Sequence, residues 1–197
     1  DLDSVVEGIV DAIWFNQGQV CCAGSRLLVQ ESVAEKLYSK IRARMETLRV
    51  GNSLDKCVDI GAIVADVQLK TIDDLVRQGK EEGNICWQPS WACPLEGYFY
   101  PPTLFTNVSP SSVIAQEEIF GPVVTLQCFQ NTEEAIQLAN ASRYGLAASV
   151  WTQDISRANL IANELHSGIV WVNCWLQRDL RTPFGGVKNS GVGREGG

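Results

Sequence analysis

Short apolar runs alternate with amphipathic segments between Val123 and Val172, and this alternation constrains the fold more than any other feature of the chain. The strand candidates are residues 123–129, 147–151 and 169–172. Between them, Thr132 is the expected N-cap of one helix, and residues 154–166 form a second helix. Continuous apolar strands separated by helices predict a mostly parallel sheet with helices on both faces, which is an α/β fold.

The first half of the chain carries a looser version of the same pattern. Helices are expected at residues 3–16, 32–48 and 65–79, and strands at residues 26–30, 84–87 and 102–108. Ser32 is the expected N-cap of the second helix. Residues 89–102 hold four of the seven prolines and are expected to form an irregular loop. After residue 172 no periodicity survives, and residues 185–197 contain six glycines.

Length and composition exclude several classes of protein. A chain of 197 residues predicts one domain, and we expect it to span residues 1–197. Apolar residues make up 45% and charged residues 20%, which argues against a disordered, collagen-like or coiled-coil chain. No apolar run reaches the about 18 residues that a membrane span needs. The net charge of −7, with no basic cluster, argues against nucleic acid or an anionic membrane as partner.

The seven cysteines are scattered, and no C-x-x-C pair occurs. His166 is the single histidine of the sequence, so a zinc site would need distant cysteines alone, and we expect no metal site. An apolar chain of this length does not need a disulfide framework. We therefore expect reduced thiols, and a cytoplasmic or organellar location.

The first candidate motif is F-N-Q-G-Q-V-C-C-A-G-S-R, residues 15–26, in a turn between an expected helix and an expected strand. Functional residues of α/β folds concentrate in such loops. A catalytic cysteine needs access, a lowered pKa and donors for an oxyanion. Gly18 allows close backbone approach, and the N–H group of Cys21 is a candidate donor. Two buried small side chains in a tight turn are the alternative interpretation.

Two further motifs follow along the chain. In Q-E-E-I-F-G-P-V, residues 116–123, Glu118 is a candidate ligand for ribose hydroxyls and Phe120 for stacking on a ring, although a solvated acidic loop is the alternative. The segment P-F-G-G-V-K-N-S-G-V-G-R-E-G-G, from Pro183, has the glycines of a phosphate cradle. It matches neither G-x-G-x-x-G after a strand nor G-x-x-x-x-G-K-[ST], so this segment alone is weak support for nucleotide binding.

Taken together and in this order, the three motifs resemble the signatures of the NAD(P)-dependent aldehyde dehydrogenase superfamily. The resemblance covers essentially all 197 residues. It implies a catalytic domain that oxidises an aldehyde to a carboxylic acid through a cysteine thiohemiacetal and a thioester, with NAD or NADP as hydride acceptor and NAD favoured. It also implies a homo-oligomer in the full-length protein.

The resemblance implies roles for particular residues. Cys21 corresponds to the nucleophile, because the catalytic cysteine stands two positions after the glutamine of G-Q-x-C, and Cys22 is its neighbour at the substrate. Glu118 corresponds to the cofactor ribose ligand, and Phe120 lies on the nicotinamide side.

In the last motif, V-N-C…P-F-G-G-x-K-x-S-G-x-G-R-E, the resemblance places Asn173 at a strand end facing the site and Phe184 in the wall of the substrate tunnel. Glu195 corresponds to an acidic residue associated with proton movement.

The segment W-L-Q-R-D-L-R, residues 175–181, resembles that of muconic-type semialdehyde dehydrogenases, whose substrates carry a carboxylate. Arg178 is therefore a candidate ligand for that carboxylate. The alternative is that Arg178 pairs with Asp179 or with a carboxylate of a neighbouring subunit.

Several parts of the family pattern are missing from this sequence. These are the cofactor-binding domain, the glutamate base of an E-L-G-G-x motif, the oxyanion asparagine and the terminal strand that builds the oligomer. We therefore expect the isolated 197-residue chain to be inactive.

Two other functions stay open. Gln19, Cys21, His166 and Asn173 follow the order Gln, Cys, His, Asn of a papain-like cysteine hydrolase, but G-Q-V-C-C-A-G-S does not match C-G-[SA]-C-[WY]. A non-catalytic scaffold or degenerate domain is the other possibility. The presence of Cys21, Glu118, Phe120, Asn173 and Glu195 argues against it.

Overall fold

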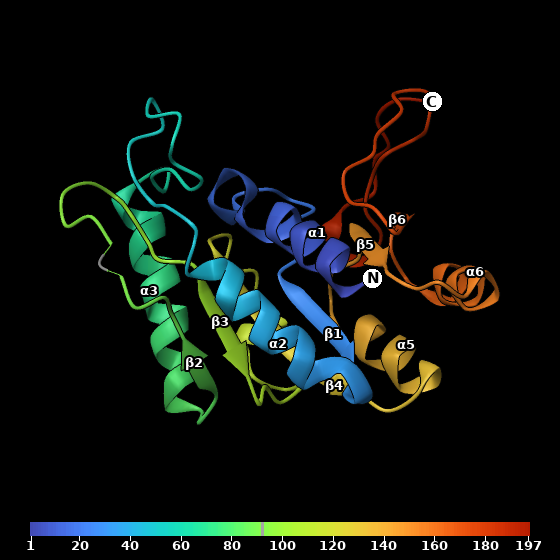
Figure 1. Ribbon diagram of the computed structural model, residues 1–197. Helices are drawn as coiled ribbons and strands as arrows, with labels where there is room; N and C mark the ends of the chain where they lie inside the picture. Colours follow the sequence, from blue (N-terminus) through green and yellow to red (C-terminus); the bar gives the residue numbers. More distant parts are fainter. Residues whose placement is uncertain (92) are drawn as a thin grey trace. The chain divides into compact units, whose positions relative to one another are not determined.

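The computed structural model describes residues 1–91 and 93–197, and the chain falls into two compact units, Asp1–Cys128 and Phe129–Gly197. The first unit contains a four-stranded sheet in the order β1-β4-β3-β2 (Figure 1). Its strands are β1 (Arg26–Gln30), β2 (Ile85–Trp87), β3 (Thr103–Thr106) and β4 (Val123–Phe129). Strands β3 and β4 are parallel, with Leu104 opposite Val124, whereas β2 runs antiparallel to β3.

Helices cover both faces of this sheet. One face carries α1 (Leu2–Trp14) and α2 (Glu31–Met45), and the other carries α3 (Asp66–Glu81) and the short α4 (Val113–Gln116). Successive side chains of a strand point to opposite faces. Leu104 accordingly packs in the α1–α2 core, and Phe105 packs in the α3–α4 core, both fully buried. The expected α/β class, with a mostly parallel sheet flanked by helices, is therefore confirmed.

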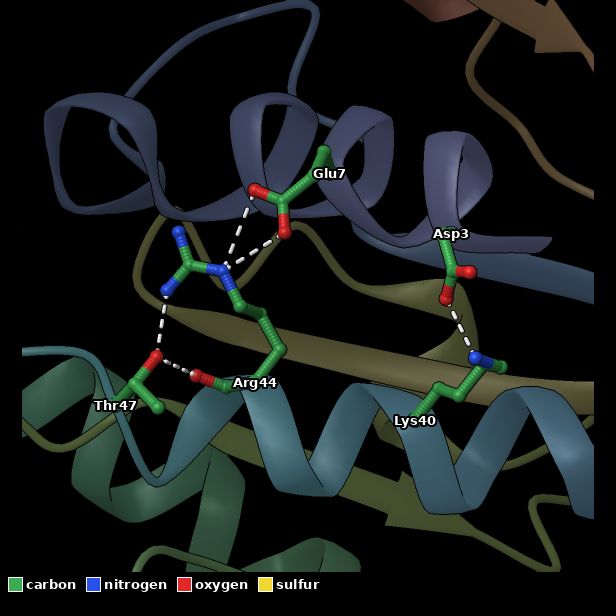
Figure 2. A network of polar contacts seen from close by, with 5 residues as sticks. All are labelled: Asp3, Glu7, Lys40, Arg44 and Thr47. Carbon is green, nitrogen blue, oxygen red and sulfur yellow. Dashed lines mark hydrogen bonds and ion pairs between the residues drawn. The ribbon is translucent and has the colours of Figure 1, made fainter. Parts of the chain in front are cut away.

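Helix α1 leads directly into the cysteine motif, so its anchoring matters for the site. Its apolar stripe, Val6, Ile9, Val10 and Ile13, is buried as the periodicity predicts. On the polar side, ion pairs join it to α2: Lys40 to Asp3, and Arg44 to Glu7 (Figure 2). The hydrogen bond from Lys40 lowers the pKa of the Asp3 carboxyl group. Because exposed ion pairs contribute little, the buried stripe supplies most of the packing energy.

Two expected helix caps are wrong by one or two residues. Helix α2 begins at Glu31, directly after β1, so Ser32 lies inside the first turn and the cap position is Gln30. Helix α5 (Thr132–Asn140) is capped by Asn131, whose side chain accepts a hydrogen bond of 2.9 Å from the Glu134 N–H group. Asparagine is a stronger N-cap than threonine, and its acceptor reaches the third residue of the helix.

The second unit contains two parallel strands, β5 (Ala147–Val150) and β6 (Ile169–Val172), joined through α6 (Ile155–Glu164). This β-α-β connection is the one that the alternation predicts. The chain then continues with little regular structure through residues 173–197, apart from a 3₁₀ turn at Lys188–Ser190 and a single bridge between Phe184 and Glu195.

Other expectations hold with small adjustments. The bounds of β1, β4 and β6 are those predicted, whereas β2 and β3 are shorter than expected. The described residues of 89–102 belong to no helix or strand, which confirms the predicted loop, and residue 92 lies outside the described residues. No helix in the described part of the chain is long and apolar enough to cross a membrane.

Candidate functional site

The cysteine motif begins with a strained turn. After α1 ends at Trp14, the residues Asn16, Gln17 and Gly18 take φ values of 49°, 59° and 73°, all in the left-handed region. Non-glycine residues adopt this region rarely, and such strain gathers at functional sites. The turn is closed by hydrogen bonds from the Gln19 N–H group to Asn16 O (2.9 Å) and from the Asn16 side chain to Gln19 O (3.0 Å).

Two glutamine side chains fasten this turn to a distant segment. Oε1 of Gln17 accepts a hydrogen bond of 3.1 Å from the Gly61 N–H group, and Oε1 of Gln19 accepts one of 3.1 Å from the Val64 N–H group. The strained backbone is therefore held by contacts more than forty positions away along the chain. Both glutamines lie inside the motif, yet nothing in the sequence indicated that their side chains hold the turn.

The cysteine turn also contacts the second motif directly. A Cβ atom placed on Gly18 would lie 2.1 Å from the Gly121 carbonyl oxygen, closer than any real contact. Trp14, which is buried, donates from its indole N–H to Pro122 O at 3.3 Å. The structure thus brings together two motifs that are a hundred residues apart, and only glycine fits at their contact.

Cys21 is exposed and Cys22 is buried, as expected for a turn that presents one thiol. The chain after them returns to α1, where the Gly24 N–H group donates to Ala12 O at 2.8 Å. Cys21 is therefore the thiol of this pair that an electrophile can reach. Its accessibility is confirmed, and its role as nucleophile stays a prediction.

In the second motif, Glu118 is exposed and Phe120 is half-buried on either side of the buried Ile119. Phe120 has a φ of 53°. Gln68 of α3 holds this backbone: its side-chain N–H₂ donates to Ile119 O at 3.0 Å and to Phe120 O at 3.2 Å. An exposed carboxylate accepts hydrogen bonds from a ribose diol, and an accessible ring can stack on nicotinamide, so this pair fits a dinucleotide. Sequence reasoning missed Gln68, because one glutamine on an amphipathic helix gives no signal.

Asn173, at the end of β6, has a φ of 54° and uses both ends of its amide on one residue. Its Oδ1 accepts from the Thr152 N–H group and its Nδ2 donates to Thr152 O, both at 2.9 Å. These bonds tie the ends of β5 and β6 together. The structure therefore gives Asn173 a structural task, and its catalytic role stays a prediction.

The same bonds weaken the hydrolase interpretation. In a papain-like site the asparagine amide orients the histidine ring, but the Asn173 amide is bound to Thr152. His166 is exposed, and its backbone N–H group donates to Asn140 Oδ1 at 2.8 Å. These contacts are typical of a helix-end residue.

The structure gathers Arg178, Phe184 and Glu195 in the second unit. The guanidinium of Arg178 lies over the Phe184 ring, with Cζ 4.4 Å from the ring centroid, and its Nη2 forms an ion pair with Glu195. Phe184 and Glu195 exchange two backbone hydrogen bonds of 2.8 Å. Asn173 shares none of these contacts in the part of the chain that the structure describes.

The alternative pairing of Arg178 with Asp179 is wrong. Asp179 pairs instead with Arg181, whose Nε donates to both carboxylate oxygens at 2.9 and 3.1 Å. Those hydrogen bonds lower the pKa of the Asp179 carboxyl group. An arginine two residues further along can fold back onto the aspartate, whereas the Arg178 side chain is committed to Phe184 and Glu195.

Comparisons with known proteins agree with the motifs. A sequence model described as Aldehyde dehydrogenase family matches residues 1–197. The chain belongs to the aldehyde dehydrogenase family. The mitochondrial aldehyde dehydrogenase of Sus scrofa is 44% identical over 195 residues, which is 99% of this chain and 37% of that protein.

Solved structures of the family match as well. An NAD+ complex of betaine aldehyde dehydrogenase from Staphylococcus aureus, with a BME-modified cysteine, is 38% identical with a TM-score of 0.96, over 100% of this chain and 41% of that one. An indole-3-acetaldehyde dehydrogenase of P. syringae, a cysteine-to-alanine mutant with NAD+ and IAA, is 41% identical with a TM-score of 0.95, over 100% of this chain and 40% of that one. The chain thus spans about two fifths of the length of these relatives.

Among the residues described, no three His, Cys, Asp or Glu side chains are grouped as ligands for a metal ion.

Proposed function

We propose that this chain is the catalytic domain of an NAD(P)-dependent aldehyde dehydrogenase that oxidises an aldehyde to a carboxylic acid. The observation that carries the proposal is the exposed thiol of Cys21, in a strained turn whose backbone contacts the loop of Glu118 and Phe120. A nucleophile and a surface for a hydride acceptor then lie on adjoining segments of one compact unit. Such preorganisation is what a two-step cysteine mechanism requires.

In the proposed mechanism, the Cys21 thiolate bonds to the aldehyde carbon, and the carbonyl oxygen becomes an oxyanion that the Cys21 N–H group stabilises. NAD(P)+, held by Glu118 and Phe120, would supply the hydride acceptor for the oxidation of this carbon. The product on Cys21 is a thioester. Water adds to it and loses one proton to a base or to solvent, the carbon–sulfur bond breaks, and the carboxylic acid departs with the thiolate restored.

The cofactor is proposed to be held by Glu118 and Phe120. The exposed carboxylate suits the ribose hydroxyls, and the half-buried ring suits the nicotinamide side. The two solved dehydrogenase structures named above are NAD+ complexes, which supports NAD over NADP.

The other roles follow the family pattern. Phe184 is proposed as a wall of the substrate tunnel, Glu195 as a participant in proton movement, and Asn173 as a residue at the edge of the site. Because Cys22 is buried, its contribution to the substrate site is proposed to act through packing of the turn.

Arg178 is proposed to bind a carboxylate on the substrate. A guanidinium fixed by stacking on Phe184 presents a planar edge that can bind a carboxylate through two hydrogen bonds. We expect Arg178→Ala to lower kcat/KM for a carboxylate-bearing semialdehyde by roughly ten- to a hundredfold. Turnover of an aliphatic aldehyde of similar length should change less than about threefold, because that substrate makes no contact of this kind. An equal loss for both would mean that Arg178 is structural.

The remaining proposals concern the whole protein, which is proposed to be a cytoplasmic homo-oligomer. The activity is tested by mixing the full-length protein with an aldehyde and NAD+, and measuring NADH and carboxylic acid together. Equal amounts of both products are expected. Aldehyde loss without NADH, or no turnover with any aldehyde, would overturn the proposal and favour a non-catalytic scaffold.

A further inference from the structure

Glu195 is the carboxylate that pairs with Arg178 in the described part of the chain. Arg178 and Glu195 are seventeen positions apart, so their pairing is a product of the fold. The guanidinium is held from two directions, by the Phe184 ring on its face and by Glu195 at its edge. A carboxylate of this chain therefore sits at the edge that a substrate carboxylate would need.

The two partners are not equally fixed. The Arg178 side chain is 34% exposed and rests on the ring, whereas the Glu195 side chain is 66% exposed. The backbone of Glu195 is held by two hydrogen bonds to Phe184. Glu195 can therefore leave the guanidinium by rotating its own side chain, and the guanidinium keeps its orientation on the ring when it does.

The neighbouring charges do not compete for this place. Asp179 is held by Arg181, and the Arg194 guanidinium donates to the Gly186 and Gly193 carbonyl oxygens at 2.8 Å. A substrate carboxylate that approaches Arg178 would come close to the negative charge of Glu195, and the two like charges would repel each other.

We propose that Glu195 is an internal counter-ion of Arg178, and that the carboxylate of a semialdehyde substrate displaces it. The proposal rests on the proposed function, and on Arg178 binding the substrate carboxylate. A neutral aldehyde leaves the Arg178–Glu195 pair intact. A carboxylate substrate replaces it, and the released Glu195 carboxylate turns toward water. Glu195 thus sets the preference between the two substrate classes, in addition to its proposed part in proton movement.

The test compares two substrates of the full-length enzyme, a semialdehyde ending in a carboxylate and the same molecule ending in an amide. The measured quantity is the ratio of their kcat/KM values. Any general catalytic loss from a change at Glu195 affects both substrates and cancels in this ratio. We expect Glu195→Gln to raise the carboxylate-to-amide ratio about two- to fivefold, the range set by the loss of an exposed ion pair. The change should lie mainly in KM. Glu195→Ala should shift the ratio in the same direction.

Two controls make the result specific. Asp179→Asn removes a neighbouring carboxylate that pairs with Arg181, and it should leave the ratio unchanged. In an Arg178→Ala background, Glu195→Gln should no longer raise the ratio. An unchanged or lowered ratio in Glu195→Gln, or an equal rise in Asp179→Asn, would overturn the exchange.

The outcome also distinguishes the exchange at Glu195 from the underlying proposal that Arg178 binds the substrate carboxylate. If Arg178→Ala lowers the ratio but Glu195→Gln does not raise it, only the exchange is wrong. If Arg178→Ala leaves the ratio unchanged, the carboxylate subsite is wrong and the exchange falls with it.

Discussion

Gly18→Ala tests the contact between the cysteine turn and the loop of Glu118 and Phe120. The added methyl group would lie 2.1 Å from Gly121 O and 2.9 Å from Ile13 O, and the position has a φ of +73°. The left-handed backbone costs an alanine about 1–2 kcal/mol. Forcing atoms into a packed contact costs about 1–3 kcal/mol more. We therefore expect the free energy of unfolding to fall by about 2–5 kcal/mol, measured by urea denaturation.

Gly83→Ala is the matched control, because Gly83 has a φ of +87° with nothing within 4 Å of the added methyl group. It should lose only the backbone part, about 1–2 kcal/mol. The difference between the two variants isolates the clash with Gly121 and Ile13. Equal losses in both variants would refute the close packing of the two motifs.

Three further predictions concern other parts of the chain. Gln68→Leu removes two hydrogen bonds to the Ile119 and Phe120 carbonyl oxygens, so the free energy of unfolding in urea should fall by about 1–3 kcal/mol. NAD+ titration of the full-length enzyme should also show weaker binding. Unchanged NAD+ affinity would mean that Gln68 does not position the residues that bind the cofactor. The hydrogen bond from the Ser112 hydroxyl lowers the pKa of Glu82, so the stabilisation from the Glu82 carboxylate is present above the unfolded-state pKa and is lost as the pH falls through the lowered folded-state value. Urea unfolding should therefore show wild type more stable than Glu82→Gln at pH 7 and equal to it in strong acid. A difference in stability that persists in acid would contradict this. The purified 197-residue chain should give no steady NADH production with aldehyde and NAD+. Iodoacetamide should still label the exposed thiol of Cys21, which mass spectrometry can establish. Sustained NADH production by this chain would contradict the need for the rest of the enzyme.

Apolar runs in the sequence were enough to predict the strands that such runs form. Strands β1, β4 and β6 have the predicted bounds, because each is an apolar run that begins directly after turn residues. The four-residue helix α4 was not predicted, because it is too short to show a helical periodicity in the sequence. The antiparallel direction of β2 depends on how the chain returns to β3 through residues 88–102, and no periodicity encodes that return.

In the candidate site too, the sequence predicted some features and not others. The motifs identified Cys21, Glu118, Phe184 and Glu195 through their resemblance to a family, and the exposure of Cys21 follows from its place in a turn. The contacts that position these residues join distant segments. Gly18 meets Gly121, and Arg178 meets Glu195, because of tertiary packing that neither spacing nor composition records.

Cys21 is the proposed nucleophile, and its buried neighbour Cys22 provides the comparison. NADH production by the full-length enzyme should be measured for Cys21→Ala and Cys22→Ala side by side, with unfolding curves to establish that both variants fold. We expect Cys21→Ala to abolish turnover, because no other thiol in the motif is exposed, and Cys22→Ala to keep most of it. Equal loss in the two folded variants, or turnover that survives in Cys21→Ala, would contradict the account.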